Sequence, residues 1–402
     1  MSDRYLPDLR ISRGSYPTFA AFVAVHLACF AAIFTGVHLR DLLIAFVLYL
    51  VRMFGITGGY HRYLAHRAYK TGRVFQFILA FIAQSSLQSG ALWWAAKHRD
   101  HHTYSDTDRD SHSPREYGFW FSHLGWIFND KGQKADYSRI PDLMAFPELV
   151  WLNRNSFLPG IVLGFVTWAL FGWSGLVVGF FWSTVALYHC TFAINSLAHV
   201  IGRQRYLTGD DSRNNWWLAL VTLGEGWHNN HHYFMASTRQ GFRWWEVDVT
   251  FYTLKVLSWC GIVWDLREPP AHVLAGQRGI SAEIKERVAA HLAASFPVER
   301  IVQRVQQRWA EAHPGQTFDE FRRRVGESLA HGREQLAQNM AQGREHMAQT
   351  LAHWSHPELP TLEELHGKAR RMFARSPAME EIVARARELI EQTVHRRLTV
   401  AA

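Results

Sequence analysis

Long uncharged runs mark the first part of this chain and predict membrane-spanning helices. Residues 17–37 contain no Asp, Glu, Lys or Arg, and a bilayer crossing needs about 20 apolar residues. After the polar turn 38–41, the apolar run 42–51 predicts a return crossing, in which Arg52 must snorkel or point into the protein. Residues 157–202 are also uncharged and predict two further crossings around a turn at 172–175.

Three short stretches hold eight of the 23 histidines. We name them box one (His61-Arg-Tyr-Leu-Ala-His66), box two (His98-Arg-Asp-His101-His102) and box three (His228-Asn-Asn-His231-His232). The His-x-x-His-His spacing of boxes two and three places three imidazoles on one helix face, where they can meet at one point. In box one, five residues turn a helix by roughly 140°. Both of its histidines serve one site only if the helix ends or bends, and Gly58-Gly59 is the expected place.

Residues 74–94 form an apolar run that Gln and Ser interrupt, and topology argues against a crossing there. A crossing would separate box one from box two by about 30 Å of hydrocarbon. We therefore expect this segment to lie in the membrane interface or inside the protein. Four crossings then return the chain to the same side, where Asn195 and His199, one helical turn apart, precede box three.

Charge and composition place the protein at a membrane and orient it. The net charge of +8 and the pI near 9.5 suit an anionic membrane surface, and no nucleic-acid motif accompanies them, so no nucleic-acid partner is expected. Positive charge is concentrated at the N-terminus and after Gly202, which puts both termini and the boxes in the cytoplasm, at the cell membrane if the source is bacterial. We expect no signal peptide, since Asp3 and Asp8 lie near the N-terminus without a small-residue cleavage site. The three cysteines lie in apolar stretches and are read as packed thiols.

The composition changes near Pro269-Pro270. We expect a membrane-embedded catalytic domain over 1–270 and a charged, helical cytosolic tail over 271–402, whose role the sequence leaves open. Within the tail, Gly332–Gln342 and Gly343–His353 form an 11-residue near-repeat. That period predicts a straight or slightly right-handed amphipathic helix.

The histidine count indicates a pair of metal ions. A lone histidine is usually structural, as expected for His26, His38 and His189, while His112 and His123 are expected beside the site or in packing. The eight box histidines and His199 make nine imidazoles, which suits two ions with four to five ligands each. All-imidazole sites suit Fe, Zn, Cu or Ni, whereas a structural zinc site is closed by four ligands, commonly including Cys. Two redox metals at a membrane surface indicate oxygen chemistry on a lipid-like substrate. A metal transporter would instead place its ligands near the bilayer midplane.

Five stretches carry a resemblance to a known family: GITGGYHRYLAHRAYK, WAAKHRDHHTYSDTDRDSHS, FSHLGW, NSLAHVIG and GEGWHNNHH. From about Leu42 to Leu266 the chain resembles the membrane fatty-acyl desaturases of the Δ9 acyl-CoA (stearoyl-CoA-like) branch. The resemblance implies an all-α integral membrane protein with four transmembrane helices and a cytosolic helical cap that holds a histidine-rich di-iron site. It assigns no separate acid or base residue. The implied ligands are His61, His66, His98, His101, His102, His199, His228, His231 and His232, with Asn195 acting through a water, and Gln88, Trp94 and Thr191 shape the bend of an acyl tunnel.

The implied reaction is insertion of a cis double bond, at Δ9, into a long-chain saturated fatty acyl thioester, using two Fe ions, O2 and two electrons. The head group stays open between CoA, acyl carrier protein and phospholipid. The electrons come from an external donor such as ferredoxin or cytochrome b5 with its reductase, since His313-Pro-Gly-Gln316 lacks the strands of a fused cytochrome and no cysteine cluster is present. The alternative is a membrane di-iron hydroxylase of a fatty acyl, alkane or lipid substrate. Glu225, Asp106 or Asp108 are candidates to orient the imidazoles.

Overall fold

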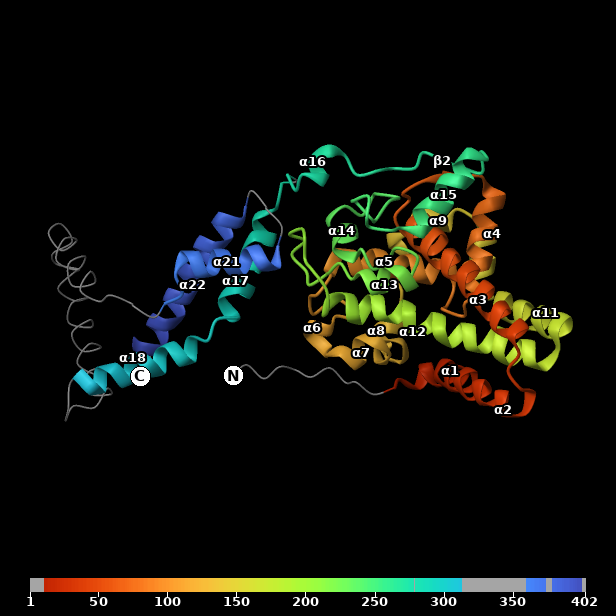
Figure 1. Ribbon diagram of the computed structural model, residues 1–402, viewed down its shortest axis with the longest axis horizontal. Coiled ribbons are helices and arrows are strands. Elements are labelled where there is room, and N and C mark those ends of the chain that lie inside the picture. Colours follow the sequence, from red (N-terminus) through yellow and green to blue (C-terminus); the bar gives the residue numbers. More distant parts are fainter. Residues whose placement is uncertain (1–10, 278, 313–358, 374–377, 400–402) are drawn as a thin grey trace. The chain divides into compact units, whose positions relative to one another are not determined.

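A computed structural model describes residues 11–277, 279–312, 359–373 and 378–399 (Figure 1). The chain divides into two units, Met1–Gln277 and Arg278–Ala402, which are treated separately below. The 11-residue near-repeat and the His313-Pro-Gly-Gln316 motif lie outside the described residues.

The first unit is mostly helical, as predicted. Its α-helices are α1 (Tyr16–Ala28), α2 (Ala32–Thr35), α3 (Leu39–Phe54), α4 (Arg73–Gln84), α5 (Ala91–Tyr104), α6 (Pro114–Tyr117), α7 (Phe119–His123), α8 (Asp130–Gln133), α9 (Pro141–Met144), α10 (Pro147–Arg154), α11 (Leu158–Ser174), α12 (Ser183–Ser196), α13 (Trp216–Val221), α14 (His228–Tyr233), α15 (Val249–Trp259) and α16 (Ala271–Leu274). Two π-helices (Gly55–Ala65, Gly175–Trp182) and five 3-10 turns (Arg13–Ser15, Cys29–Ala31, Gly125–Phe128, Tyr137–Arg139, Leu197–His199) join them. The strands β1 (Lys70–Thr71) and β2 (Val263–Trp264) pair antiparallel.

Among the described residues, three helical stretches are long and apolar enough to cross a membrane: Arg13–Thr35, Leu39–Ala65 and Leu158–His199. The third stretch is broken at Gly172, where φ is 72°. This break lies in the turn that the sequence predicted at 172–175. Gly164 lies against Phe180 and Gly179 against Thr167, so the two halves pack antiparallel. In Figure 1, α11 and α12 form this hairpin beside α3. Because the third stretch folds back on itself, the three stretches are compatible with four membrane crossings. The number of crossings stays a prediction.

The segment predicted not to cross contains α4, which has 12 residues. At about 1.5 Å per residue such a helix is roughly 18 Å long, too short for about 30 Å of hydrocarbon. Its partly apolar surface instead packs on the π-helix of box one.

Arg52 is fully buried and points into the protein. Of the two expected arrangements, snorkelling to the membrane surface and pointing into the protein, the structure shows the second. Its Nη1 donates to Thr184 Oγ1 at 2.7 Å and its Nη2 to Ser183 Oγ at 2.5 Å. These bonds tie α3 to α12 and satisfy the guanidinium inside an otherwise apolar helix pair.

Box one lies at the end of the π-helix Gly55–Ala65. The wider turn of this helix brings His61 and His66 to one side despite their five-residue spacing. The His66 N–H donates to the His61 carbonyl at 3.1 Å. Because a π-helix bonds each residue to the fifth one before it, the two imidazoles lie on one side with ring centroids 4.9 Å apart. A Cβ on Gly55 would lie 2.7 Å from the Ala83 nitrogen, so the glycine there allows close packing on α4. The expected departure from α-helical geometry therefore occurs, by widening of the helix before it ends at His66.

The described part of the second unit is helical, as expected for the tail. It contains α17 (Ala282–Ala294), α18 (Val298–Ala312), α21 (Leu362–Met372) and α22 (Met379–Thr399), and α22 contacts the other three. The first unit extends further than the expected boundary at 270, because Val273 of α16 packs on Tyr206, Tyr233 and Phe242. The boundary between the units falls after Gln277.

Candidate metal centre

The nine candidate histidine ligands meet in the first unit as two groups of imidazoles. Within each group, one ring nitrogen of every member lies within 4.8 Å of the others. Cluster A comprises His61, His66, His98, His102 and His231, and cluster B comprises His101, His199, His228 and His232. Groups of five and four imidazoles are large enough for the four to five candidate ligands that were expected for each of two ions.

Boxes two and three are each divided between the clusters, which corrects the expectation that each presents three imidazoles to one point. In box two, His98 and His102 enter cluster A, and His101 enters cluster B. Box three does the reverse, since only His231 of its three histidines enters cluster A. Viewed down a helix axis, residues i and i+4 differ in direction by only about 40°, whereas residue i+3 is turned about 60° to the other side of residue i. The same spacing thus allows one short helix to contribute to two neighbouring sites.

The ring nitrogens are spaced as ligands of one ion would be. In cluster A, His61 Nε2 lies 3.0 Å from His231 Nε2, and His66 Nε2 lies 2.8 Å from His98 Nε2. In cluster B, His199 Nε2 and His228 Nε2 are 3.0 Å apart. Metal–imidazole bonds of about 2.1 Å at right angles would separate neighbouring nitrogens by about 3 Å. The donor set therefore fits a metal ion in each cluster.

The protonation states also suit metal binding. Burial, reinforced by the neighbouring imidazoles, holds the pKa of His66, His98, His102, His228 and His231 well below the usual value. These rings are therefore neutral at physiological pH, the form that binds metals. Among the described residues, His232 Nε2 is buried without a hydrogen-bond partner. A bound ion would satisfy it.

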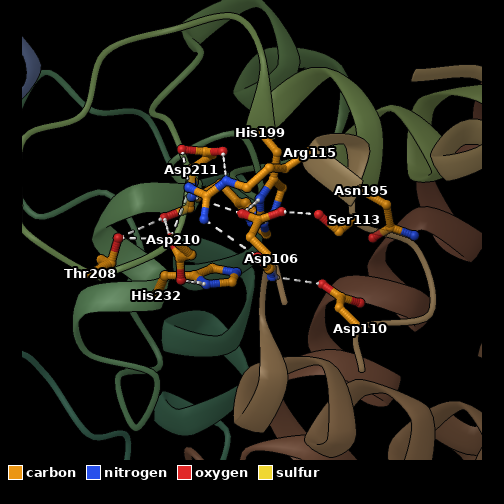
Figure 2. A network of polar contacts seen from close by, with 12 residues as sticks. Asp106, Asp110, Ser113, Arg115, Asn195, His199, Thr208, Asp210, Asp211 and His232 are labelled. Atoms are coloured by element: carbon orange, nitrogen blue, oxygen red, sulfur yellow. Dashed lines mark hydrogen bonds and ion pairs between the residues drawn. The ribbon is translucent and has the colours of Figure 1, made fainter. Parts of the chain in front are cut away.

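Four carboxylates, of which Asp106, Asp110 and Glu225 are buried and Asp210 is partly buried, hold the outer nitrogens of cluster histidines. His199 Nδ1 lies 2.7 Å from Asp106 Oδ2, and His232 Nδ1 lies 2.8 Å from Asp210 Oδ2 (Figure 2). His101 Nδ1 is 3.0 Å from Asp110 Oδ2, and His61 Nδ1 contacts Glu225 Oε2. A carboxylate that accepts from Nδ1–H fixes the tautomer and turns the Nε2 lone pair toward the cluster.

Two of the three candidate orienting carboxylates, Asp106 and Glu225, therefore contact ligand histidines. Asp108 is exposed and contacts none among the described residues, so that candidate was wrong. Asp110 and Asp210 take comparable positions and were missed, although Asp110 is only two residues from the wrong candidate. Burial alone would raise the pKa of Asp210, but the contact with His232 outweighs it and places the pKa well below the usual value, so this group is ionised.

Figure 2 shows how the chain fixes Asp106 itself. Ser113 Oγ donates to Asp106 Oδ1 at 2.7 Å, and the Asp211 N–H donates to Asp106 Oδ2 at 2.8 Å. The loop after α5 and the loop before α13 are thereby joined at cluster B.

The remaining candidates lie around the clusters. Asn195 lines the same cavity as His101 and His228 but belongs to neither cluster. His112 lies beside His101 and Asp110, which is a position next to the site. Three other histidines form a separate hydrogen-bonded chain, in which His189 lies 3.1 Å from His123 and 3.2 Å from His26.

A largely apolar cavity leads from α1 to both clusters. Phe22 and Val25 of α1 line it, as do His98 of cluster A and His101 of cluster B. All three predicted substrate-contacting residues lie in its wall: Gln88, Trp94 and Thr191. Gln88 Nε2 donates to Thr191 Oγ1 at 3.1 Å, and Trp94 stacks on His98 with ring centroids 4.8 Å apart.

Replacing Asp210 by Asn is expected to weaken metal binding in cluster B by about 10- to 100-fold. The amide can present N–H instead of an acceptor to His232 Nδ1, which disfavours the ligating tautomer. The measurement is retained transition metal after a chelator titration. Asp108→Asn, at an exposed carboxylate, is the matched control and should retain wild-type affinity; equal losses in the two variants would contradict the orienting role.

Comparison with known proteins gives consistent matches. The family model for fatty acid desaturase matches residues 41–255. The chloroplastic palmitoyl-monogalactosyldiacylglycerol delta-7 desaturase of Arabidopsis thaliana is 38% identical over 254 residues, which cover 62% of this chain and 68% of the relative. An sn-1 stearoyl-lipid 9-desaturase of Synechocystis is 37% identical over 259 residues (61% and 81% covered), and an acyl-CoA 5-desaturase of Anemone leveillei is 36% identical over 249 residues (61% and 77%).

Proposed function

Because this chain belongs to the fatty acid desaturase family, we propose that it inserts a cis double bond at carbon 9 of a long-chain saturated fatty acyl thioester. The observation that carries the proposal is the apolar cavity that ends at two clusters of neutral imidazoles. A fatty acyl chain offers no polar group near its middle, so an enzyme that oxidises it there must hold it by shape. The names of the relatives include lipid-linked and CoA-linked substrates, which makes a lipid-linked acyl chain the alternative carrier.

The overall reaction removes two hydrogens from adjacent methylenes. O2, two electrons and two protons are consumed with them, and two waters and the alkene are formed. Two iron ions held by clusters A and B would supply the oxidising chemistry, with Asn195 as a further contact through water. The electrons are proposed to come from an external donor such as ferredoxin or cytochrome b5 with its reductase.

The protein's own part in this reaction is positioning and exclusion of water. The apolar wall from α1 to α12 accommodates the methylenes and keeps the oxidised segment dry. The Gln88–Thr191 hydrogen bond joins the loop before α5 to α12, which fixes the width of the cavity beside the clusters. Trp94, stacked on His98, lies where the cavity meets cluster A. These contacts select which methylene pair faces the metals.

Replacing Thr191 by Val is expected to lower the desaturation rate about tenfold, because Gln88 loses its partner inside the cavity wall and the chain is held less accurately. The product mixture should also broaden to neighbouring double-bond positions. Thr253→Val, at a partly exposed hydroxyl of α15 outside the cavity, serves as the control. An unchanged rate and product position in the Thr191 variant would refute the positioning role.

We further propose four crossings, with both termini and the clusters on the cytoplasmic side.

The first unit contains both clusters and the whole cavity, so ending the chain after Gln277 should preserve turnover with a chemical or generic electron donor. Rates within about twofold of the full chain are expected. Loss of turnover with such a donor, in a truncated protein that retains its metal, would show that the second unit takes part in catalysis.

Gas chromatography–mass spectrometry of fatty acids from expressing cells, with double bonds derivatised, tests the proposed function. New cis-Δ9 monoenes are the expected result. Hydroxylated acids without new alkenes would assign the chain to the hydroxylase alternative. Supplying purified enzyme with acyl-CoA or with lipid-linked acyl chains then identifies the carrier.

A further inference from the structure

A second pocket of the first unit lies beside the end of box one and contains none of the cluster ligands. It is formed where the π-helix ends, where α4 begins and where β1 pairs with β2. Four of its lining residues are basic (Arg67, Lys70, Arg73 and Arg267), and one is acidic (Asp265).

Two buried donors at this pocket lack partners. Gln76 is 1% exposed, and its Oε1 accepts from the Tyr63 hydroxyl at 2.8 Å. Its Nε2 is buried without a hydrogen-bond partner among the described residues, and so is Arg67 Nη1. Buried donors of this kind are rarely left unpaired in folded proteins. They indicate a ligand that accepts hydrogen bonds.

The charge of the pocket is also incompletely balanced. Lys70 pairs with Asp265 at 2.8 Å, Arg73 pairs with Glu148 at 2.7 Å, and Arg67 Nε lies 3.3 Å from Asp142 Oδ2. Within the part of the chain that the structure describes, the Arg267 side chain has no ion pair or hydrogen bond. Positive charge together with unpaired N–H donors suits an anion, and guanidinium groups in particular suit phosphate oxygens.

Exposed apolar side chains in the pocket wall and in neighbouring stretches of the chain indicate where the anion comes from. Val74, next to Arg73, is 77% exposed, and Trp264, in the pocket wall, is 44% exposed. Trp259 at the end of α15 is 75% exposed. Tryptophans beside basic residues are typical of the zone where lipid headgroups meet hydrocarbon. A free phosphate would require no such apolar border.

We propose that this pocket binds the phosphate group of an anionic membrane phospholipid, with Arg267, Arg67 and Gln76 as donors. The bound headgroup holds the corner between β1 and α4 at the membrane surface. Since α4 packs closely on the π-helix of box one, the lipid also steadies the element that carries His61 and His66. The site is independent of which acyl bond the clusters oxidise.

Binding of short-chain lipids to the full-length protein in detergent tests this site. Dihexanoyl phosphatidylglycerol is the probe, and dihexanoyl phosphatidylcholine and inorganic phosphate are the comparisons, each titrated by calorimetry. We expect phosphatidylglycerol to bind most tightly, and Arg267→Ala and Gln76→Leu to weaken its binding about tenfold. Lys255→Ala removes a partly exposed cation of α15 outside the pocket and should change nothing.

Arg267 is exposed, so its variant should fold and retain the wild-type metal content, which serves as the folding control. Inorganic phosphate that binds as tightly as phosphatidylglycerol, with the same sensitivity to Arg267→Ala, would overturn the assignment to a lipid. Phosphatidylglycerol binding that Arg267→Ala and Gln76→Leu leave unchanged would overturn the site itself.

Discussion

A His101→Ala variant is expected to make no detectable unsaturated product, a loss of at least 100-fold, while it still inserts into the membrane. His101 is one of only four imidazoles in cluster B, and Asp110 holds its outer nitrogen at 3.0 Å. Removing it leaves three candidate nitrogen ligands in cluster B, and the buried Asp110 loses its closest imidazole partner, so the second metal ion is lost or misplaced. The measurement is the fatty acid profile of cells that express the variant at wild-type level.

His38→Ala is the matched control, because this histidine is exposed and belongs to neither cluster. It should give the wild-type profile. Retained turnover in the His101 variant would refute the assignment of cluster B as a metal site.

Replacing Arg62 by Ala should lower the free energy of unfolding by about 3–5 kcal/mol, the usual cost of breaking a buried ion pair. Arg62 is 1% exposed and donates to Glu225 Oε1 at 2.9 Å and to Asp248 Oδ2 at 3.0 Å. Without the guanidinium, both carboxylates stay buried, and fewer hydrogen bonds and no positive charge from residue 62 offset their loss of hydration. Because Glu225 also contacts His61 Nδ1, cluster A should lose metal affinity as well.

Denaturant unfolding in detergent, followed together with metal content, measures both effects. Arg73→Ala removes an exposed ion pair with Glu148 and is expected to change stability little. If the Arg62 variant unfolds at the same denaturant concentration as the wild type, the buried network does not hold box one in place.

The sequence predicted that the nine candidate histidines meet in one region, because their spacing follows helix periodicity. The division of these histidines between clusters A and B could not be predicted. His101 and His102 are neighbours in the chain, yet they enter different clusters. The tertiary arrangement decides which is which: His102 lies against His231 of α14, and His101 lies against His232. The same spacing, His-x-x-His-His, is compatible with one site or with two.

The orienting carboxylates were harder to predict because they lie in loops. The backbone at Asp106 adopts a φ of 56°, a left-handed conformation that reverses the chain and leaves Asp110 buried against His101 while Asp108 is exposed. Asp210 reaches His232 from a loop 22 residues earlier. The π-helix of box one was likewise absent from the prediction, since the spacing of His61 and His66 required a departure from the α-helix without specifying which.

The metal content of the active, full-length enzyme tests the central claim most directly. Clusters A and B predict two iron ions per chain, measured by elemental analysis of a preparation whose turnover with O2 and an electron donor is known. A fully active preparation with one iron ion or none per chain, or with zinc in both clusters, would contradict the account.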